Sequence, residues 1–199
     1  QALIAGAPWV QCCEFDPTIP ASSVTIDHLE AARDTVHYLA GKGRKRIGLV
    51  NGDMRYLYSH HREKGYRQAL ERSEELEYPW SGVAYTDEIS PEAGSQAVKE
   101  LLALPEPPDA VFAVSDVLAV GVVHAALEAG LRVPEDLAVV GFDGIPFTRS
   151  LNPPLTTIEQ PMNQLGARSV QLLLQKIRNP NASVVREVLP WTRVERASS

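Results

Sequence analysis

The sequence predicts an α/β protein built from parallel sheets flanked by helices on both faces, and two observations carry this prediction. Short apolar runs of strand length alternate with longer amphipathic segments of helical spacing along the whole chain. The apolar runs lack the polar alternation of a half-exposed strand, which indicates strands that are covered on both sides. With 199 residues, of which 44% are hydrophobic, the chain can bury one large core or two smaller ones.

Local signals place each element along the chain. Ser90 and Pro91 mark a helix start, because serine caps free N–H groups and proline suits the first helical position. Residues 56–61, which hold tyrosines and histidines, are interpreted as a polar loop. Strands are expected at residues 9–13, 23–26, 46–50, 82–85, 110–114, 137–142, 184–189 and 191–195. Helices are expected at residues 28–41, 62–76, 91–103, 117–129 and 161–178.

Composition limits the partners and the compartment of the chain. A net charge of −6 argues against direct binding of nucleic acid, because a surface that binds phosphates needs excess positive charge. The two cysteines, Cys12 and Cys13, are adjacent, and neighbouring cysteines rarely form a disulfide. A reduced, cytoplasmic location is therefore expected. No apolar stretch is long enough to span a bilayer, so no membrane partner is expected either.

Ligands of open parallel sheets bind beyond the carboxyl ends of the strands, which directs attention to the residues that follow each apolar run. Asp143 comes directly after one such run, in the sequence GFDG. Its carboxylate could accept hydrogen bonds from two hydroxyls or amines of a ligand. An aspartate in a turn can equally hold its own backbone, and position alone leaves the two interpretations level. Residues after other strands are Glu14, Phe15, residues 54–62, Ser115 and Asp116.

Each of the other polar candidates also has a structural interpretation. Arg62 offers a planar fork of donors that suits hydroxyl pairs, although a surface arginine at a helix start is commoner. Asp116 follows Ser115 at a predicted helix start, where an N-cap worth about 1 kcal/mol explains it. Phe112 lies within an apolar strand and is most simply a core residue, although its ring could also stack on a planar or sugar ligand.

The sequence gives little support for catalysis. It contains neither a GxSxG motif nor histidine, cysteine and carboxylate spacings typical of a metal site. The basic segment GKGRKR, residues 41–46, lacks the phosphate-loop pattern and precedes a strand instead of following one. No enzyme activity, no cofactor and no metal are therefore expected.

Four long segments together resemble a known family. They are VTIDHLEAARDTVHYLAGKGRKRIGLVNG, REKGYRQAL, PDAVFAVSDVLAVGVVHAALEAGLRVPEDLAVVGFDGIP and PPLTTIEQPMNQLGARSVQLLL. In order and spacing they are similar to the effector domain of the lactose/galactose-repressor family of bacterial transcription regulators. The resemblance covers nearly the whole chain. The segments EFDPTIPASSVTIDH and ISPEAGSQAV are most similar to the cytidine-repressor subgroup.

The resemblance implies a periplasmic-binding-protein-like fold with two subdomains. Residues 1–26 and 160–189 would form an incomplete N-terminal subdomain, and residues 27–159 and 190–199 the C-terminal one. It also implies the effector-binding and dimerisation core of a repressor that senses a nucleoside or sugar-like metabolite and controls operator binding allosterically. Operator DNA would be bound through a helix-turn-helix that this chain lacks.

Family membership further implies roles for individual residues. A homodimer interface would include residues of the helix after Asp116, namely Val117, Val120 and Val123, together with Leu151. The resemblance makes Ile89 and Met162 apolar walls of the pocket. The ligand-binding residues would be Arg62, Asp143, Phe112, Ser115, Asp116, Glu14, Phe15 and Tyr58.

Two other functions share parts of this pattern. A periplasmic sugar-binding protein or a receptor domain would have the same fold, and a signal peptide upstream would favour that function over a regulator. An enzyme of the flavodoxin-like or Rossmann type is disfavoured, because no GxGxxG follows a strand at the start of a βαβ unit.

Overall fold

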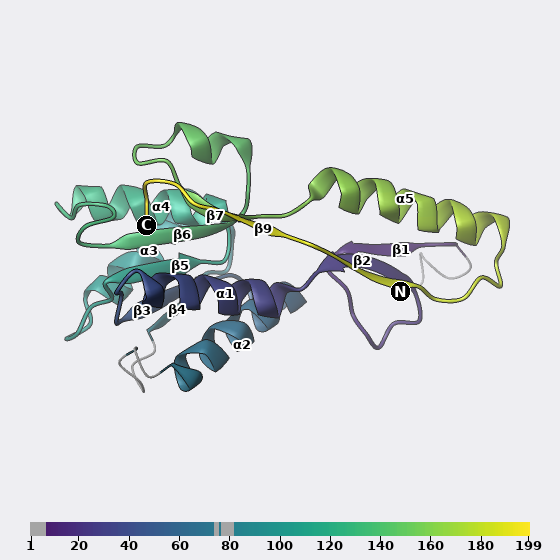
Figure 1. The fold of residues 1–199 in the computed structure, drawn as a ribbon, viewed down its shortest axis with the longest axis horizontal. Helices are drawn as coiled ribbons and strands as arrows, with labels where there is room; N and C mark the ends of the chain where they lie inside the picture. The colour runs from purple at the N-terminus through teal and green to yellow at the C-terminus, as the bar shows by residue number, and fades with distance from the viewer. Residues whose placement is uncertain (1–6, 74–75, 77–81) are drawn as a thin grey trace. The chain divides into compact units, whose positions relative to one another are not determined.

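A computed structural model describes residues 7–73, 76 and 82–199 of the chain (Figure 1). The chain divides into two compact units. Unit 1 comprises Gln1–Asp27 and Gln160–Trp191, and unit 2 comprises His28–Glu159 and Thr192–Ser199. The strands within each unit are mostly parallel and alternate with helices, so the predicted α/β class is confirmed.

Unit 2 is built on a six-stranded sheet in the order β4-β3-β5-β6-β7-β9. Every neighbouring pair is parallel except β7 and β9, which run antiparallel. Because the polar atoms of the backbone pair along the sheet, apolar side chains can fill both faces, and every residue of β3 and β5 is buried. The strands are β3 (Ile47–Asn51), β4 (Val83–Tyr85), β5 (Ala110–Ala113), β6 (Ala138–Asp143), β7 (Thr156–Glu159) and β9 (Thr192–Val194).

Two helix pairs, α1 with α2 and α3 with α4, cover this sheet. Parallel crossovers are right-handed, so α2 and its partner α1 lie on one face while α3 and α4 lie on the other. The two rings of Phe112 and Phe142 are fully buried in the core of this unit. The helices are α1 (His28–Gly41), α2 (Leu57–Arg72), α3 (Pro91–Leu102) and α4 (Asp116–Glu128), with a short 3-10 helix, η2 (Pro146–Ser150).

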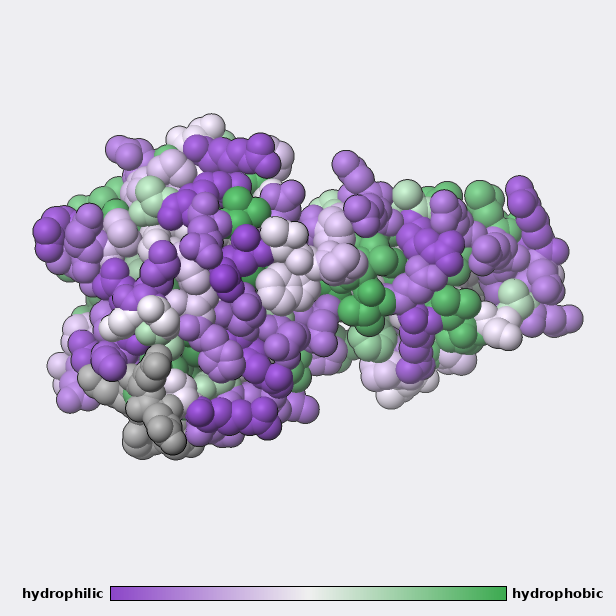
Figure 2. Space-filling model, viewed as in Figure 1, coloured by the Kyte–Doolittle hydropathy of each residue, from purple (hydrophilic) through white to green (hydrophobic). Residues whose placement is uncertain are grey.

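Unit 1 is smaller and has a three-stranded parallel sheet in the order β1-β2-β8. Helix α5 (Met162–Arg178) packs on β1 (Val10–Cys13) and β2 (Ser22–Ile26), and β8 (Arg186–Leu189) completes the sheet. Both cysteines are free thiols, as predicted. Apolar residues gather on the surface of this unit in Figure 2. The exposed apolar residues of α5 are Met162, Val170, Leu174 and Ile177.

Helix α2 begins at Leu57, so the predicted start at Arg62 and the predicted loop at residues 56–61 are wrong. Its N-cap is Tyr56, whose side chain makes no capping hydrogen bond, and the usual sequence signal for a helix start is therefore missing. Tertiary burial of side chains in the first two turns fixes the start instead. The helix ends at Arg72, and Ser73 follows as an extended C-cap, so the predicted end at residue 76 is wrong as well.

Helix α4 corrects two further predictions. Its N-cap is Ser115, whose Oγ accepts a hydrogen bond from the backbone N–H of Val117 at 3.2 Å, so Asp116 is the first helical residue and not the cap. Val120 and Val123 are only 9% and 1% exposed. Both side chains are buried in the core of unit 2, so they have almost no surface left for the predicted dimer interface.

Candidate functional site

A recess of about 190 Å³ lies at the carboxyl ends of β5 and β6 in unit 2. The two strands are adjacent and parallel, so the residues that follow them meet at the same edge of the sheet. Ser115, after β5, donates a hydrogen bond from Oγ to Oδ2 of Asp143 at the end of β6, over 3.2 Å. The recess is lined by Tyr58, Arg62, Ile89, Val114, Ser115 and Asp143.

The early start of α2 places two of these residues on one face of the helix. Tyr58 and Arg62 are four positions apart, which aligns their side chains on consecutive turns. The guanidinium carbon of Arg62 lies 4.9 Å from the centre of the Tyr58 ring and 3.5 Å from that of Phe142. Contact with two aromatic rings suits a guanidinium and restricts its rotation.

Arg62 is buried, with 3% of its surface exposed, and its donors are directed to fixed acceptors. Nη1 donates to the carbonyl oxygen of Val114. Nη2 lies 3.2 Å and Nε 3.4 Å from Nδ1 of His28. Nη2 also lies 3.7 Å from Oδ1 of Asp143, which makes a loose ion pair. The recess thus presents a guanidinium and a carboxylate side by side, a donor and an acceptor for neighbouring ligand hydroxyls.

Asp143 is the accessible carboxylate of the recess, because 31% of its side chain is exposed. Its backbone has a φ of +113°, which non-glycine residues rarely adopt. Gly144 follows with a φ of +75°, so the chain turns sharply at the end of β6. Backbone outliers of this kind persist where surrounding contacts hold them, and they concentrate at functional sites.

Asp116 has a different role, because its carboxylate is fully buried. Oδ2 accepts from the backbone N–H of Ile145 at 2.8 Å, and Oδ1 accepts from Oγ1 of Thr157 at 2.6 Å. Burial raises the pKa of Asp116 to about 7, and the nearby charge of Asp143 adds to the increase. The structure thus uses Asp116 to anchor the turn after Asp143 and does not bring it to the wall of the recess.

Phe112 also lies away from the recess lining. Its ring is fully buried and lies 6.4 Å from that of Phe142 at an angle of 37°, so it supports the residue on which Arg62 stacks. Glu14 and Phe15 follow β1 in unit 1 and are both partly buried. Their predicted role in ligand binding stays a prediction.

The sequence reasoning missed His28, which is 5% exposed and contacts Arg62 directly. A signal was present, because His28 comes two residues after the predicted strand 23–26 and the strand-end rule applies there too. Val114 was missed because it contributes a backbone carbonyl, and any residue type supplies one.

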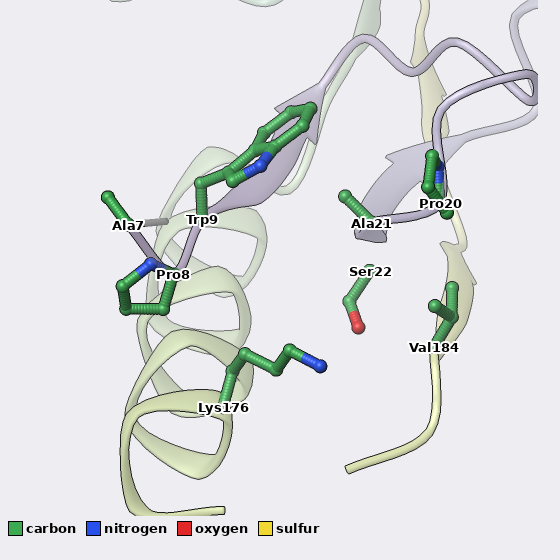
Figure 3. A pocket seen from close by; sticks show the side chains of 8 residues that line it. All are labelled: Ala7, Pro8, Trp9, Pro20, Ala21, Ser22, Lys176 and Val184. Atoms are coloured by element: carbon green, nitrogen blue, oxygen red, sulfur yellow. The ribbon is translucent and has the colours of Figure 1, made fainter. Parts of the chain in front are cut away.

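A second recess of about 110 Å³ lies within unit 1 (Figure 3). The side chain of Lys176 extends into it, and its Nζ donates to the carbonyl oxygen of Ala182 at 3.2 Å. The other side chains around it are mostly apolar, and none is a predicted site residue. Its lining consists of Ala7, Pro8, Trp9, Pro20, Ala21, Ser22, Lys176 and Val184.

The part of the chain that the structure describes contains neither a metal cluster nor a membrane-spanning helix. Residues 7–73, 76 and 82–199 contain no group of three histidine, cysteine or carboxylate side chains that could hold a metal ion. Over the same residues, no helix has both the length and the apolar character needed to cross a membrane.

Residues 36–199 match the sequence profile of the periplasmic binding protein-like domain. The chain belongs to that family. It is 41% identical over 192 residues to the HTH-type transcriptional repressor CytR of Escherichia coli K12, and the match covers 96% of this chain. The chain spans only 56% of the length of that repressor.

Solved structures agree with this assignment. A crystal structure of an uncharacterized protein from Actinobacillus succinogenes is 44% identical with a TM-score of 0.93, covering 100% of this chain and 72% of that one. A LacI family transcriptional regulator from Enterococcus faecium with bound ribose is 29% identical with a TM-score of 0.87, covering 96% and 70%. The predicted resemblance to lactose/galactose-repressor effector domains is confirmed.

Proposed function

We propose that this chain is the effector-binding core of a bacterial transcription repressor, and that the recess in unit 2 takes part of a nucleoside or sugar-like effector. The observation that carries the proposal is the pairing of Arg62 and Asp143 at the ends of the strands. A carboxylate that accepts and a guanidinium that donates can bind two adjacent hydroxyls of one ring, a feature that sugars and nucleosides share. The apolar wall of Ile89 and Val114 suits the ring carbons.

The rest of the regulator is proposed from its relatives. The similarity to CytR and to a ribose-bound regulator supports a repressor that works in the cytoplasm and is not an enzyme. In this proposal units 1 and 2 are the two subdomains, and Glu14 and Phe15 keep their predicted ligand-binding role. The protein acts as a homodimer, and a helix-turn-helix outside these 199 residues binds operator DNA.

Isothermal titration calorimetry of the full-length protein with cytidine and with ribose tests the site. Asp143→Ala or Arg62→Ala should weaken binding of the accepted compound by about 100-fold or more, because each removes a charged hydrogen-bonding partner of the ligand. Asp136→Ala is the matched control, since Asp136 precedes β6 at its opposite end and pairs with Arg132 at the surface. Undiminished affinity in both site variants would remove the two residues from the effector site.

A further inference from the structure

His28 holds a position that the proposed ligand contacts do not explain. It is the first residue of α1, it is 5% exposed, and its ring lies 5.9 Å from that of Phe142. Nδ1 faces the guanidinium of Arg62 and lies within 3.4 Å of both Nη2 and Nε. The imidazole thus contacts the side chain that the recess needs without lining the recess itself.

The chemistry of this contact fixes the protonation of the imidazole. A guanidinium has five N–H donors and no acceptor, so Nδ1 can only accept from it. The imidazole is then neutral, and its single ring proton is on Nε2. A proton on Nδ1 would point at the guanidinium and place two cationic groups in contact.

The same contact explains why Arg62 and Asp143 are not tightly paired. An arginine and a carboxylate normally close to about 2.7–2.9 Å, often through two parallel hydrogen bonds. Here Nη2 and Oδ1 are 3.7 Å apart. His28 on one side, the carbonyl of Val114 on another and the ring of Phe142 beneath hold the guanidinium back from the carboxylate.

We propose that His28 is a positioning residue for effector binding, a role that rests on the function proposed for the recess. Its Nδ1 holds Arg62 away from Asp143, so that the carboxylate and the guanidinium both line the recess instead of closing into a tight ion pair. Without that acceptor, Arg62 closes on Asp143, and the ligand must break an ion pair before it binds.

Three substitutions separate this role from simple packing. His28→Asn places an amide oxygen the same number of bonds from Cα as Nδ1 and keeps the acceptor. His28→Gln moves the acceptor one bond further out, and His28→Phe keeps a ring but has no acceptor. We expect the asparagine variant to bind cytidine or ribose within about threefold of the wild type, and the other two to bind about tenfold or more weakly. Equal losses in all three variants, or wild-type affinity in His28→Phe, would overturn the proposal.

A nitrogen-15 NMR spectrum of the imidazole in the ligand-free protein gives a readout that does not depend on an effector. An unprotonated Nδ1 and a protonated Nε2 are expected for His28 at neutral pH. A protonated Nδ1 overturns the proposal. If the wild type binds neither cytidine nor ribose, the proposed effector class fails, while the spectrum still decides how His28 faces Arg62.

Discussion

Two aspartates near the end of β6 have different roles because one is partly exposed and the other is buried. Asp143 is open to the recess, whereas Asp116 is buried and holds the backbone of Ile145 and the hydroxyl of Thr157. The part-exposed carboxylate of Asp143 lines the recess. The buried one fixes the turn that presents it, so a change at Asp116 affects the site through the backbone.

The raised pKa of Asp116 makes the stability of the protein depend on pH. Its pKa is about 7 when folded, against an ordinary value of 3.8, so the folded protein binds an extra proton between these values. Stability from this residue is complete below about pH 4 and is lost as the pH rises toward about 7. The free energy of unfolding should therefore fall over this range by a few kcal/mol relative to that of Asp116→Asn.

Urea denaturation of both proteins at pH 5, 6 and 7.5 measures this difference. The comparison with the variant cancels the titration of all other groups, provided that both proteins unfold in two states. Curves of stability against pH that run parallel in the two proteins would show that Asp116 titrates normally.

At this scale the structure brings some of the predicted site residues to the recess and places others away from it. The strand-end rule and the family resemblance indicated Arg62, Asp143, Ser115 and Tyr58, all of which line the recess. The same reasoning included Phe112, which instead lies in the core. A shift of one residue along a strand decides whether a side chain lies in the core or at the end of the sheet. The residue type alone does not show where the strand ends.

At the scale of elements, the contact between α3 and α4 depends on glycine. A Cβ built on Gly121 would lie 1.8 Å from the carbonyl oxygen of Pro91, and one on Gly94 would lie 2.1 Å from that of Leu118. Real atoms do not approach so closely, so the two helix backbones are in direct contact at these positions. Ser90 and Pro91 set the start of α3, as predicted, and thereby fix which residues meet α4.

Gly121→Ala tests this contact, and Gly166→Ala in α5 is a control whose expected effect on stability is opposite. Gly121→Ala should lower the free energy of unfolding by about 1–3 kcal/mol or more, because the backbones must separate. Gly166→Ala should raise it by about 0.5–1 kcal/mol, since Gly166 lies inside α5 with nothing within 4 Å of its built Cβ. Thermal and urea denaturation measure both changes, and a neutral Gly121→Ala would show that α3 and α4 have room between them.

Helix boundaries were predictable where local chemistry sets them and unpredictable elsewhere. The start of α3 has a capping serine and a proline, and the prediction was correct to the residue. The start of α2 has neither, and it was predicted five residues too late. Burial of Ser59 and Arg62 decides that start, and burial follows from the whole fold.

At the scale of the whole molecule, the fold class was predictable because the alternation of strands and helices runs through the entire chain.

The sequence also predicts the sign of the net charge. With a net charge of −6, these 199 residues should not bind operator DNA by themselves. Fluorescence anisotropy with labelled DNA at 0.1 M salt measures this, and tight binding would contradict the proposed division of labour between the chain and a DNA-binding domain.

In the proposed full-length repressor, effector and operator must influence each other equally. If the effector changes the affinity for DNA by some factor, DNA changes the affinity for the effector by the same factor. Titration of the effector in the presence and absence of operator DNA should give a factor of about 5–150. The variants Asp143→Ala and Arg62→Ala should keep their affinity for DNA and lose its response to the effector.

The backbone of Asp143 has a consequence for any attempt to make this protein more robust. A φ of +113° costs an aspartate free energy that glycine would not lose, so Asp143→Gly should tolerate heat as well as the native protein or better. Laboratory evolution that selects on heat resistance alone would therefore favour a glycine at this position. In the proposed repressor, the selected variants would be more stable and would lack the carboxylate that the effector needs.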